Sequence, residues 1–302
     1  MDESLKGYEI AVLQNASSAG GAGAVASDLR AVSDLVARTA RLAQVLTDEL
    51  VPAAARIGVT EEILSSRVGA DAIRIVKRAV STGRADAILT ALVDIADVAT
   101  QFDNLGYSQF EAEEEILGRS AARRQAAGYA EAIFEDITSA TELEEIEDEL
   151  FKFARVVQTN DSLRAALADS SRPVGDRRKL IGDLLNGRVT PVTIRLARAA
   201  LHGRSRDPVS SLDWMAELAA QARGWRVARV TAARPLDEGE RSELGRALGD
   251  MTGRSVELLV TEDAGLIGGA VISIGNVLVD ASVQHRLDQL SEQLLGSEVA
   301  VH

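Results

Sequence analysis

The three histidines, His202, His285 and His302, are the side chains of this sequence best suited to binding a metal ion or moving a proton. No two of them have the spacing of metal ligands, and His202 falls at the end of a predicted helix, where a cap or surface role is expected. No nucleophile motif with a nearby base is present. The absence of cysteine excludes disulfides, Cys-ligated zinc and thiol catalysis. We therefore expect no catalytic residue and no metal site.

Two glycine-rich segments are the only candidates for a phosphate-binding loop. Gly20-Gly21-Ala22-Gly23 has no predicted strand before it and no lysine after it, and the segment 265–269 leads into a strand instead of a helix N-terminus. The acidic cluster between Glu142 and Glu149 could attract a divalent cation, but an apolar stripe runs through the same helix and favours a solvated face. The sequence predicts no cofactor.

The composition indicates a helical protein that binds other proteins. The chain has 302 residues, 3% of them aromatic, with a formal net charge of −13. Such a charge argues against a basic face for nucleic acid or anionic lipid. The start of the sequence lacks the basic and apolar regions of a signal peptide. With no run of about 18 apolar residues, we expect the polypeptide not to span a membrane by itself.

An internal repeat organises the first two thirds of the chain. Gly7-Tyr8 and Gly128-Tyr129 are separated by 121 positions. The same offset aligns further identical residues: Leu42 with Leu163, Asp48 with Asp169, Pro52 with Pro173, Arg56 with Arg177, Arg67-Val68 with Arg188-Val189, and Ile73-Arg74 with Ile194-Arg195. This separation is far longer than a solenoid repeat, so the sequence predicts a duplicated domain.

Each copy is predicted to form six short helices. In the second copy they lie at about 121–138, 144–157, 162–168, 173–185, 192–201 and 209–222, because apolar residues recur there at helical spacing between glycine and proline signals. Glu115 and Arg119, one helical turn apart, support a solvated linker helix between the copies.

The pattern changes after Gly224. Residues 226–233 and 256–261 alternate as strands do, and a capping box at Asp237 and Glu240 starts a helix between them. Gly275-Asn276 between β-branched runs predicts a hairpin, and a final apolar-striped helix follows.

The predicted fold is mainly α, with two six-helix bundles followed by a small α/β (βαββα) module. The predicted domains are 1–101 (first bundle), 102–120 (charged linker helix), 121–223 (second bundle) and 224–302 (α/β module).

Two segments resemble the delta subunit family of F-type ATP synthases, to which the mitochondrial oligomycin-sensitivity-conferring protein belongs. Asp263-Ala-Gly-Leu-Ile-Gly-Gly-Ala-Val-Ile-Ser-Ile-Gly275, followed by Val279-Asp-Ala-Ser-Val283, is similar to the signature near the family's C-terminus. Gly128-Tyr-Ala-Glu-Ala-Ile-Phe-Glu135 is similar to its opening helix. The resemblance covers 121–297. Ala264 and Ser273 depart from the usual pattern, and the extra domain 1–120 resembles chains in which a stalk b segment is fused to delta.

The resemblance implies a stator subunit of the proton-translocating ATP synthase, without catalysis of its own. Such a subunit links the catalytic alpha/beta head to the stalk b subunit at the cytoplasmic face of the cell membrane, which it meets only through the complex.

The family's first and fifth helices bind an N-terminal helix of an alpha subunit. Here that groove maps to Tyr129, Ala132, Ile133, Val192, Leu196, Ala199 and Ala200. The stalk contact maps to Val283, Leu287, Leu290 and Leu294, and the structural signature to Gly268, Gly269, Gly275 and Asp280.

Two alternatives stay open at this point. One is an unrelated helical scaffold or adaptor protein. The other is a nucleotide-dependent enzyme that uses the C-terminal α/β module, although the missing phosphate loop argues against it. The partner of the first bundle is also open.

Overall fold

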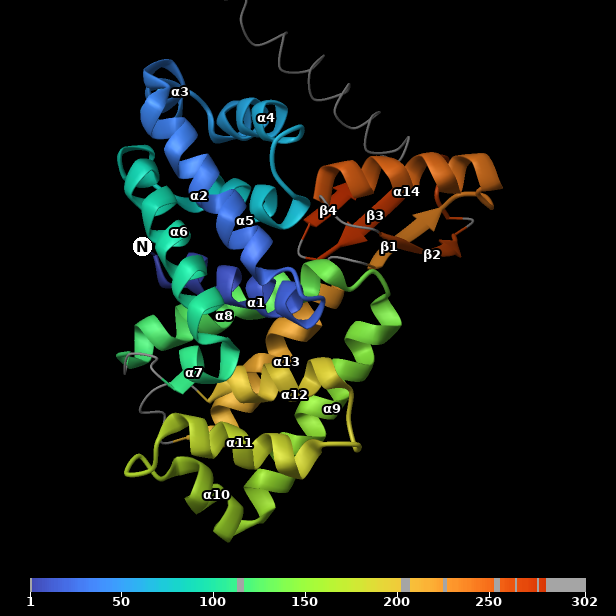
Figure 1. Ribbon diagram of the computed structural model, residues 1–302. Coiled ribbons are helices and arrows are strands. Elements are labelled where there is room, and N and C mark those ends of the chain that lie inside the picture. Colours follow the sequence, from blue (N-terminus) through green and yellow to red (C-terminus); the bar gives the residue numbers. More distant parts are fainter. Residues whose placement is uncertain are drawn as a thin grey trace, which may run out of the picture. The chain divides into compact units, whose positions relative to one another are not determined.

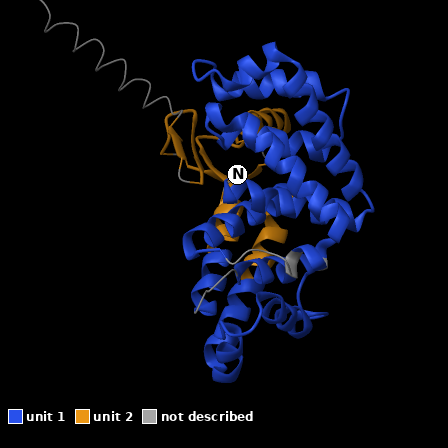
Figure 2. Ribbon diagram, turned by 60° about the vertical axis from the view of Figure 1, so that its left-hand side comes forward, with its two compact units in different colours: residues 1–136, 149–216 blue, residues 137–148, 217–302 orange. Residues whose placement is uncertain are grey.

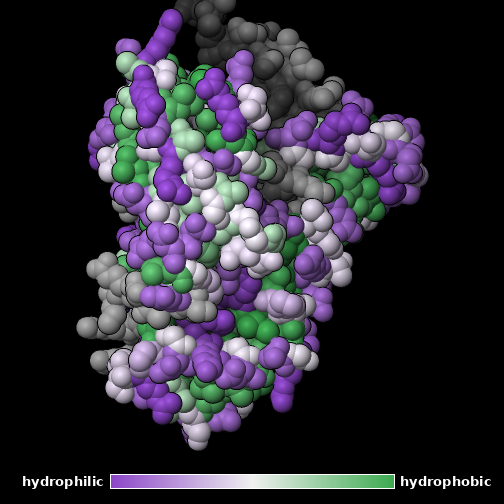
Figure 3. Space-filling view, in the orientation of Figure 1, coloured by the Kyte–Doolittle hydropathy of each residue, from purple (hydrophilic) through white to green (hydrophobic). Residues whose placement is uncertain are grey.

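The computed structural model describes residues 2–112, 117–201, 207–224, 227–252, 256–263, 265–275 and 277–280 (Figure 1). The chain divides into two compact units, Met1–Asp136 with Glu149–Ala216, and Ile137–Asp148 with Glu217–His302 (Figure 2). On the face shown in Figure 3, hydrophobic residues occur in small patches between hydrophilic ones, as on most water-exposed surfaces. Among the described residues, no helix combines the length and hydrophobicity that crossing a bilayer requires.

The two copies of the repeat contain the same succession of helices. The first copy has α1 (Glu3–Ser18), α2 (Ala22–Arg38), α3 (Ala40–Thr47), α4 (Ala53–Leu64), α5 (Ala70–Thr82), a short 3-10 turn (Ala85–Ala87) and α6 (Ile88–Leu105). The second has α8 (Arg119–Asp136), α9 (Ala140–Thr159), α10 (Asp161–Ala168), α11 (Val174–Leu185), α12 (Pro191–Ala200) and α13 (Pro208–Gly224). At the offset of 121, the first and last positions of α3 and α4 coincide with those of α10 and α11. The prediction of a mainly helical fold is confirmed.

The cap of the fifth helix is also repeated. Gly69, the N-cap of α5, donates its backbone N–H to Asp28 of α2 at 2.8 Å. Thr190, the N-cap of α12, donates its N–H to both carboxylate oxygens of Glu149 in α9 at 3.1 Å. Negative charge at a helix N-terminus satisfies open N–H groups and is favoured by the helix dipole. Each copy therefore ties its second helix to its fifth by the same device.

A buried arginine joins the third and fourth helices in both copies. Arg56 donates to the carbonyl of Leu46 at 3.2 Å, and Arg177 donates to the carbonyl of Leu167 at 3.2 Å. The duplication thus extends to polar contacts inside each bundle.

The connection between the copies is not one continuous helix. Gly106 has φ of 70°, a conformation that glycine adopts without strain, and it ends α6. A separate short helix, α7 (Tyr107–Ala112), follows, and its Phe110 packs on Phe102 with ring centroids 5.3 Å apart. The expectation of a single linker helix missed the break because the charge spacing carries no information about Gly106.

Glu9 is a carboxyl group buried inside the first copy. Its side chain is fully buried, and neither carboxylate oxygen has a hydrogen-bond partner. Burial raises the pKa of Glu9 well above its usual value; Lys6 opposes the rise and Asp94 adds to it. The folded chain therefore keeps the Glu9 carboxyl protonated under conditions in which the unfolded chain has released the proton.

Glu9→Gln is expected to stabilise the chain at neutral and alkaline pH and to have little effect below about pH 4.5. The unfolded state loses its proton first, so the stability of the wild type falls as pH rises through the raised pKa of the folded state. An amide does not titrate, so the variant escapes this fall. Thermal unfolding across pH measures the difference, with Glu62→Gln at an exposed position of α4 as control. A constant difference at every pH would contradict the prediction.

The second unit contains a four-stranded sheet. Its strands are β1 (Val227–Ala232), β2 (Glu257–Glu262), β3 (Ala270–Ile274) and β4 (Val277–Asp280), in the order β2-β1-β3-β4. β1 pairs in parallel with β2 and antiparallel with β3, and β3 pairs antiparallel with β4. The helix α14 (Glu238–Thr252) connects β1 to β2, as a parallel pair requires.

The core of this unit follows the strand alternation. Ala228, Val230, Ile272 and Ile274 point to one face of the sheet and pack with Leu248 of α14. The predicted small α/β module is confirmed, and its sheet has four strands where the predicted order βαββα has three. The predicted final helix lies outside the described residues.

Two predicted local signals also appear in this unit. In the predicted capping box, Asp237 accepts from the N–H of Glu240 at 2.8 Å, and the Glu240 carboxylate accepts from the N–H of Asp237 at 3.0 Å. Ile274 pairs directly with Val277, as a two-residue hairpin requires.

Candidate helix-binding site

The first helices of the two copies pack directly on one another, as Figure 1 shows for α1 and α8. A Cβ atom added to Gly7 would lie 1.8 Å from the backbone oxygen of Gln125, and one added to Gly128 would lie 1.8 Å from that of Ser4. The offset of 121 turns Gly7 into Gly128 and Ser4 into Gln125. The interface is therefore isologous, like that of a twofold dimer, and glycine is needed on both sides for the backbones to meet.

Two tyrosines cross this interface in the same way. Tyr8 donates its hydroxyl hydrogen to Glu135, and Tyr129 donates to Gln14, the residue equivalent to Glu135. Burial, followed by the hydrogen bond to Glu135, raises the pKa of the Tyr8 hydroxyl above its usual value. The hydroxyl therefore stays protonated and acts as a donor.

An arginine of the fifth helix supports each tyrosine. Arg74 donates Nε to the Tyr8 hydroxyl at 2.9 Å, and Arg195 does so to Tyr129 at 3.2 Å. Each guanidinium also lies over its ring, 5.5 Å and 5.7 Å from the centroid. These contacts combine a hydrogen bond with a cation–π interaction, and they orient the tyrosines toward the partner copy.

The same arginines reach across to the other copy. Arg74 donates to Asp136 and to the backbone carbonyl of Ala132, both at 2.6 Å. Arg195 donates to Asn15, the residue equivalent to Asp136, and to the carbonyl of Ala11 at 3.4 Å.

Near the C-terminal ends of α1 and α8, Asn15 and Asp136 contact each other, with the Asn15 amide donating at 2.6 Å. The two halves of the interface meet at this pair.

The charges at the interface are not symmetric. Arg78 forms an ion pair with Glu131, and its side chain is 21% exposed. The residues at the equivalent positions are Ala199 and Ile10, which are buried. The first copy therefore contributes one extra cation, Arg78, and α8 of the second copy contributes the carboxylates of Glu131, Glu135 and Asp136. This arrangement favours pairing between unlike copies over pairing between like ones.

The residues predicted to bind an alpha-subunit helix lie on two helices that contact each other, α8 and α12. Val192 is half-buried and the others are buried: Tyr129, Ala132, Ile133, Leu196, Ala199 and Ala200. Tyr129 and the Ala132 carbonyl contact the first copy of the same chain. We call α8 and α12 together the α8/α12 surface. Its binding of an alpha-subunit helix stays a prediction.

Apart from Tyr129 and Ala132, which were predicted for another partner, the residues that join the two copies were missed as site residues by sequence reasoning. A signal for them existed in the repeat, since Gly-Tyr at 7–8 and 128–129 and Arg at 74 and 195 are identical at the offset of 121. Identity at glycine, tyrosine and arginine positions in copies that otherwise differ indicates a shared contact more than a shared core.

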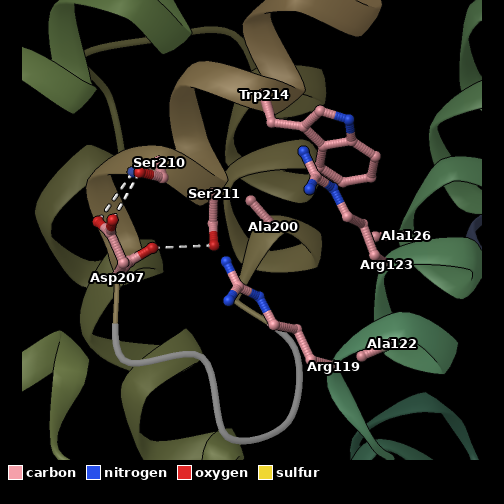
Figure 4. Close-up of a pocket in the computed structure, with 9 residues that line it drawn as sticks. All are labelled: Arg119, Ala122, Arg123, Ala126, Ala200, Asp207, Ser210, Ser211 and Trp214. Carbon is pink, nitrogen blue, oxygen red and sulfur yellow. Dashed lines mark hydrogen bonds between the residues drawn. The ribbon is translucent and has the colours of Figure 1, made fainter.

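A shallow pocket opens beside α8, α12 and α13 (Figure 4). Arg123 lies over the ring of Trp214, with its guanidinium carbon 4.5 Å from the centroid. Ser210 donates its backbone N–H to Asp207 at 3.0 Å, in the cap of α13. Ala200, one of the predicted groove residues, lines the same pocket, which therefore gives the α8/α12 surface a polar end.

The predicted C-terminal residues are only partly described. Gly269 and Gly275 have positive φ of 80° and 56°, as expected where β3 begins and ends, and Gly268 directly precedes Gly269. Asp280 ends β4. The predicted stalk-binding residues Val283, Leu287, Leu290 and Leu294 lie outside the described residues.

Comparison with known proteins identifies relatives that match most of the chain. The family model "ATP synthase delta (OSCP) subunit" matches residues 126–294. The "ATP synthase subunit delta" of Salinispora arenicola is 35% identical over 90% of this chain and 88% of its own, and that of Frankia alni is 34% identical over 90% and 87%. The Corynebacterium urealyticum protein of the same name is 30% identical over 97% of this chain and 94% of its own. The first copy is therefore shared with curated relatives.

Proposed function

This chain belongs to the ATP synthase delta (OSCP) subunit family, and we propose that it links the catalytic alpha/beta head to the stalk b subunit and resists the torque of the rotor. A peripheral-stalk role in general follows from the family. The family match over 126–294, which covers the second copy and the α/β module, is the observation that carries the proposal.

The proposed head contact is the α8/α12 surface, which would receive an N-terminal helix of an alpha subunit. This surface already binds a helix, because α1 packs along α8 in the structure. Small side chains such as Ala132 and Ala199 allow a guest helix to approach closely. The physical fit for a helix supports the proposal.

The proposed stalk contact is the C-terminal module, through the predicted apolar stripe of Val283, Leu287, Leu290 and Leu294. The chain would then lie at the cytoplasmic face of the cell membrane, attached through the complex. We propose no reaction for the chain itself. Phosphate release from ATP by the purified chain tests this, and turnover abolished by mutating one of its own residues would contradict it.

Two variants are expected to separate the two attachments. Ala199→Trp should weaken head binding by about 1–3 kcal/mol, roughly 5–150-fold, because a large ring at the contact prevents close helix packing. A chain ending at Asp280 should keep head binding and lose stalk binding. Retention of purified head, or of purified stalk, on the immobilised chain measures each contact.

The control for Ala199→Trp is Leu184→Trp, a partly exposed position on α11 of the same copy, which should leave both contacts intact. Circular dichroism checks that each variant is folded. Unchanged head binding in Ala199→Trp would show that the head does not bind the α8/α12 surface. A chain that binds neither head nor stalk would contradict the proposed function as a whole.

A further inference from the structure

We infer that the first copy is an intramolecular competitor for the helix-binding surface of the second copy. In the structure α1 covers α8, so an external helix can bind the α8/α12 surface only after the two copies have separated. The identity of that external helix as part of the ATP synthase head rests on the proposed function. The competition itself rests on the contacts of this chain alone.

The first argument is steric. The backbones of α1 and α8 are so close that a single Cβ at Gly7 would lie 1.8 Å from the oxygen of Gln125. Ala132 is 1% exposed and Tyr129 is 6% exposed. No room remains for another helix on this strip of α8, so α1 and a guest exclude one another.

The second argument concerns the strength of the contact between the copies. Its ion pairs are only partly buried: the side chains of Arg74 and Asp136 are 24% and 39% exposed, and that of Glu131 is 31% exposed. Ion pairs that are accessible to water and salt contribute little to stability. The ion pairs therefore add little to the free energy that holds the copies together.

The third argument is that each copy keeps a core of its own. Buried side chains of the first copy include Leu29, Ile75 and Leu92, and those of the second include Leu167 and Ile181. These residues lie on helices that contact other helices of their own copy, as α2 contacts α6, α5 contacts α4, and α11 contacts α12. The first copy can then leave the α8/α12 surface as a folded body, and the competition needs no unfolding.

The contacts of α1 also indicate which side chains a competing helix needs. α1 has no side chain at the crossing point, Gly7, and it places hydrogen-bond acceptors seven and eight positions later, at Gln14 and Asn15. These acceptors meet Tyr129 and Arg195. A guest helix with a small residue followed by acceptors at this spacing satisfies the same donors.

A disulfide lock tests the competition, because the chain has no cysteine of its own. Asn15→Cys with Asp136→Cys replaces two side chains that contact each other across the interface. The opposite change is Arg78→Glu, which sets two carboxylates against each other at Glu131 and leaves the α8/α12 surface unchanged. The probe is a fluorescent peptide of residues 2–20, and its anisotropy is measured against each full-length chain.

We expect the peptide to bind the Arg78→Glu chain roughly tenfold more tightly than the wild type, because opening removes the resident competitor. The oxidised double-cysteine chain should bind it more weakly than the same chain after reduction. A peptide with alanine in place of Gly7 should not bind to any chain. Equal binding to the locked and reduced chains would overturn the inference, and so would equal binding to Arg78→Glu and the wild type.

Purified ATP synthase head in place of the peptide separates this inference from the proposed function. If the lock blocks the peptide and the head never binds to any chain, the competition holds and the proposed head contact fails. If the lock blocks neither ligand and both bind, the competition fails and the head contact stands.

Discussion

Gly7→Ala is expected to lower the free energy of unfolding by about 3 kcal/mol, the upper end for overpacking, and to disrupt the contact between the two copies. The added Cβ would lie 1.8 Å from the backbone oxygen of Gln125 and 3.0 Å from the backbone nitrogen of Tyr129. A flexible side chain could move aside, but a helix backbone cannot do so without shifting the helix. The helices must move apart, and the hydrogen bonds of Tyr8 and Tyr129 are then lost.

Gly58→Ala is the matched control. Gly58 also lies inside a helix, α4, but nothing lies within 4 Å of the Cβ that alanine would add. Alanine is preferred over glycine in helices by about 1 kcal/mol, so this change should stabilise the chain. Chemical denaturation of the two variants measures both effects. Stabilisation by both substitutions would show that α1 and α8 do not touch in solution.

Arg74→Met is expected to destabilise the chain by about 2 kcal/mol, after allowance for the partial exposure of its ion pairs. The substitution removes the donor to Tyr8, Asp136 and the Ala132 carbonyl and the charge beside Glu135. It leaves Glu135 and Asp136 without this cation, and Arg78, 5.6 Å from the ring centroid, remains as the cation beside Tyr8. Methionine keeps much of the apolar stem, so the fall in the free energy of unfolding measures mainly the lost polar contacts.

Arg195→Met provides the comparison inside the same molecule. Arg195 occupies the equivalent position, but its partner across the interface is the neutral Asn15. We expect its loss to cost about half as much as that of Arg74, and to depend less on salt. Denaturation at low and high ionic strength measures this. Equal losses with equal salt dependence would contradict the asymmetric charge arrangement described above.

Much of the fold was predictable from local sequence signals. The offset of 121 identified the duplication, and Pro173 marked the start of a helix that the structure gives as Val174–Leu185. Alternation and the capping box at Asp237 predicted β1 and α14. These features depend on neighbouring residues along the chain, which is why periodicity and caps reveal them.

The pairing of the two copies could not be predicted in this way. Tyr129 and Ala132 have the character of either core or binding residues, and nothing in their spacing states which surface covers them. Gly7 and Gly128 reduce helix propensity. Their stabilising contribution, the close approach of two backbones, exists only when a second helix lies against them. Such contacts join residues more than 50 positions apart, so they depend on tertiary structure.

The ion pair of Arg78 with Glu131 has a consequence for how this protein can evolve. In a dimer of separate identical chains, every mutation appears on both sides of the axis, so a cation introduced for one contact is also introduced in its mirror image. Fusion of the two copies into one gene removes this constraint. Arg78 is equivalent to Ala199 in the other copy, and its partner Glu131 is equivalent to Ile10. One half of the interface can thus be selected for holding the copies together, and the other half for letting them part.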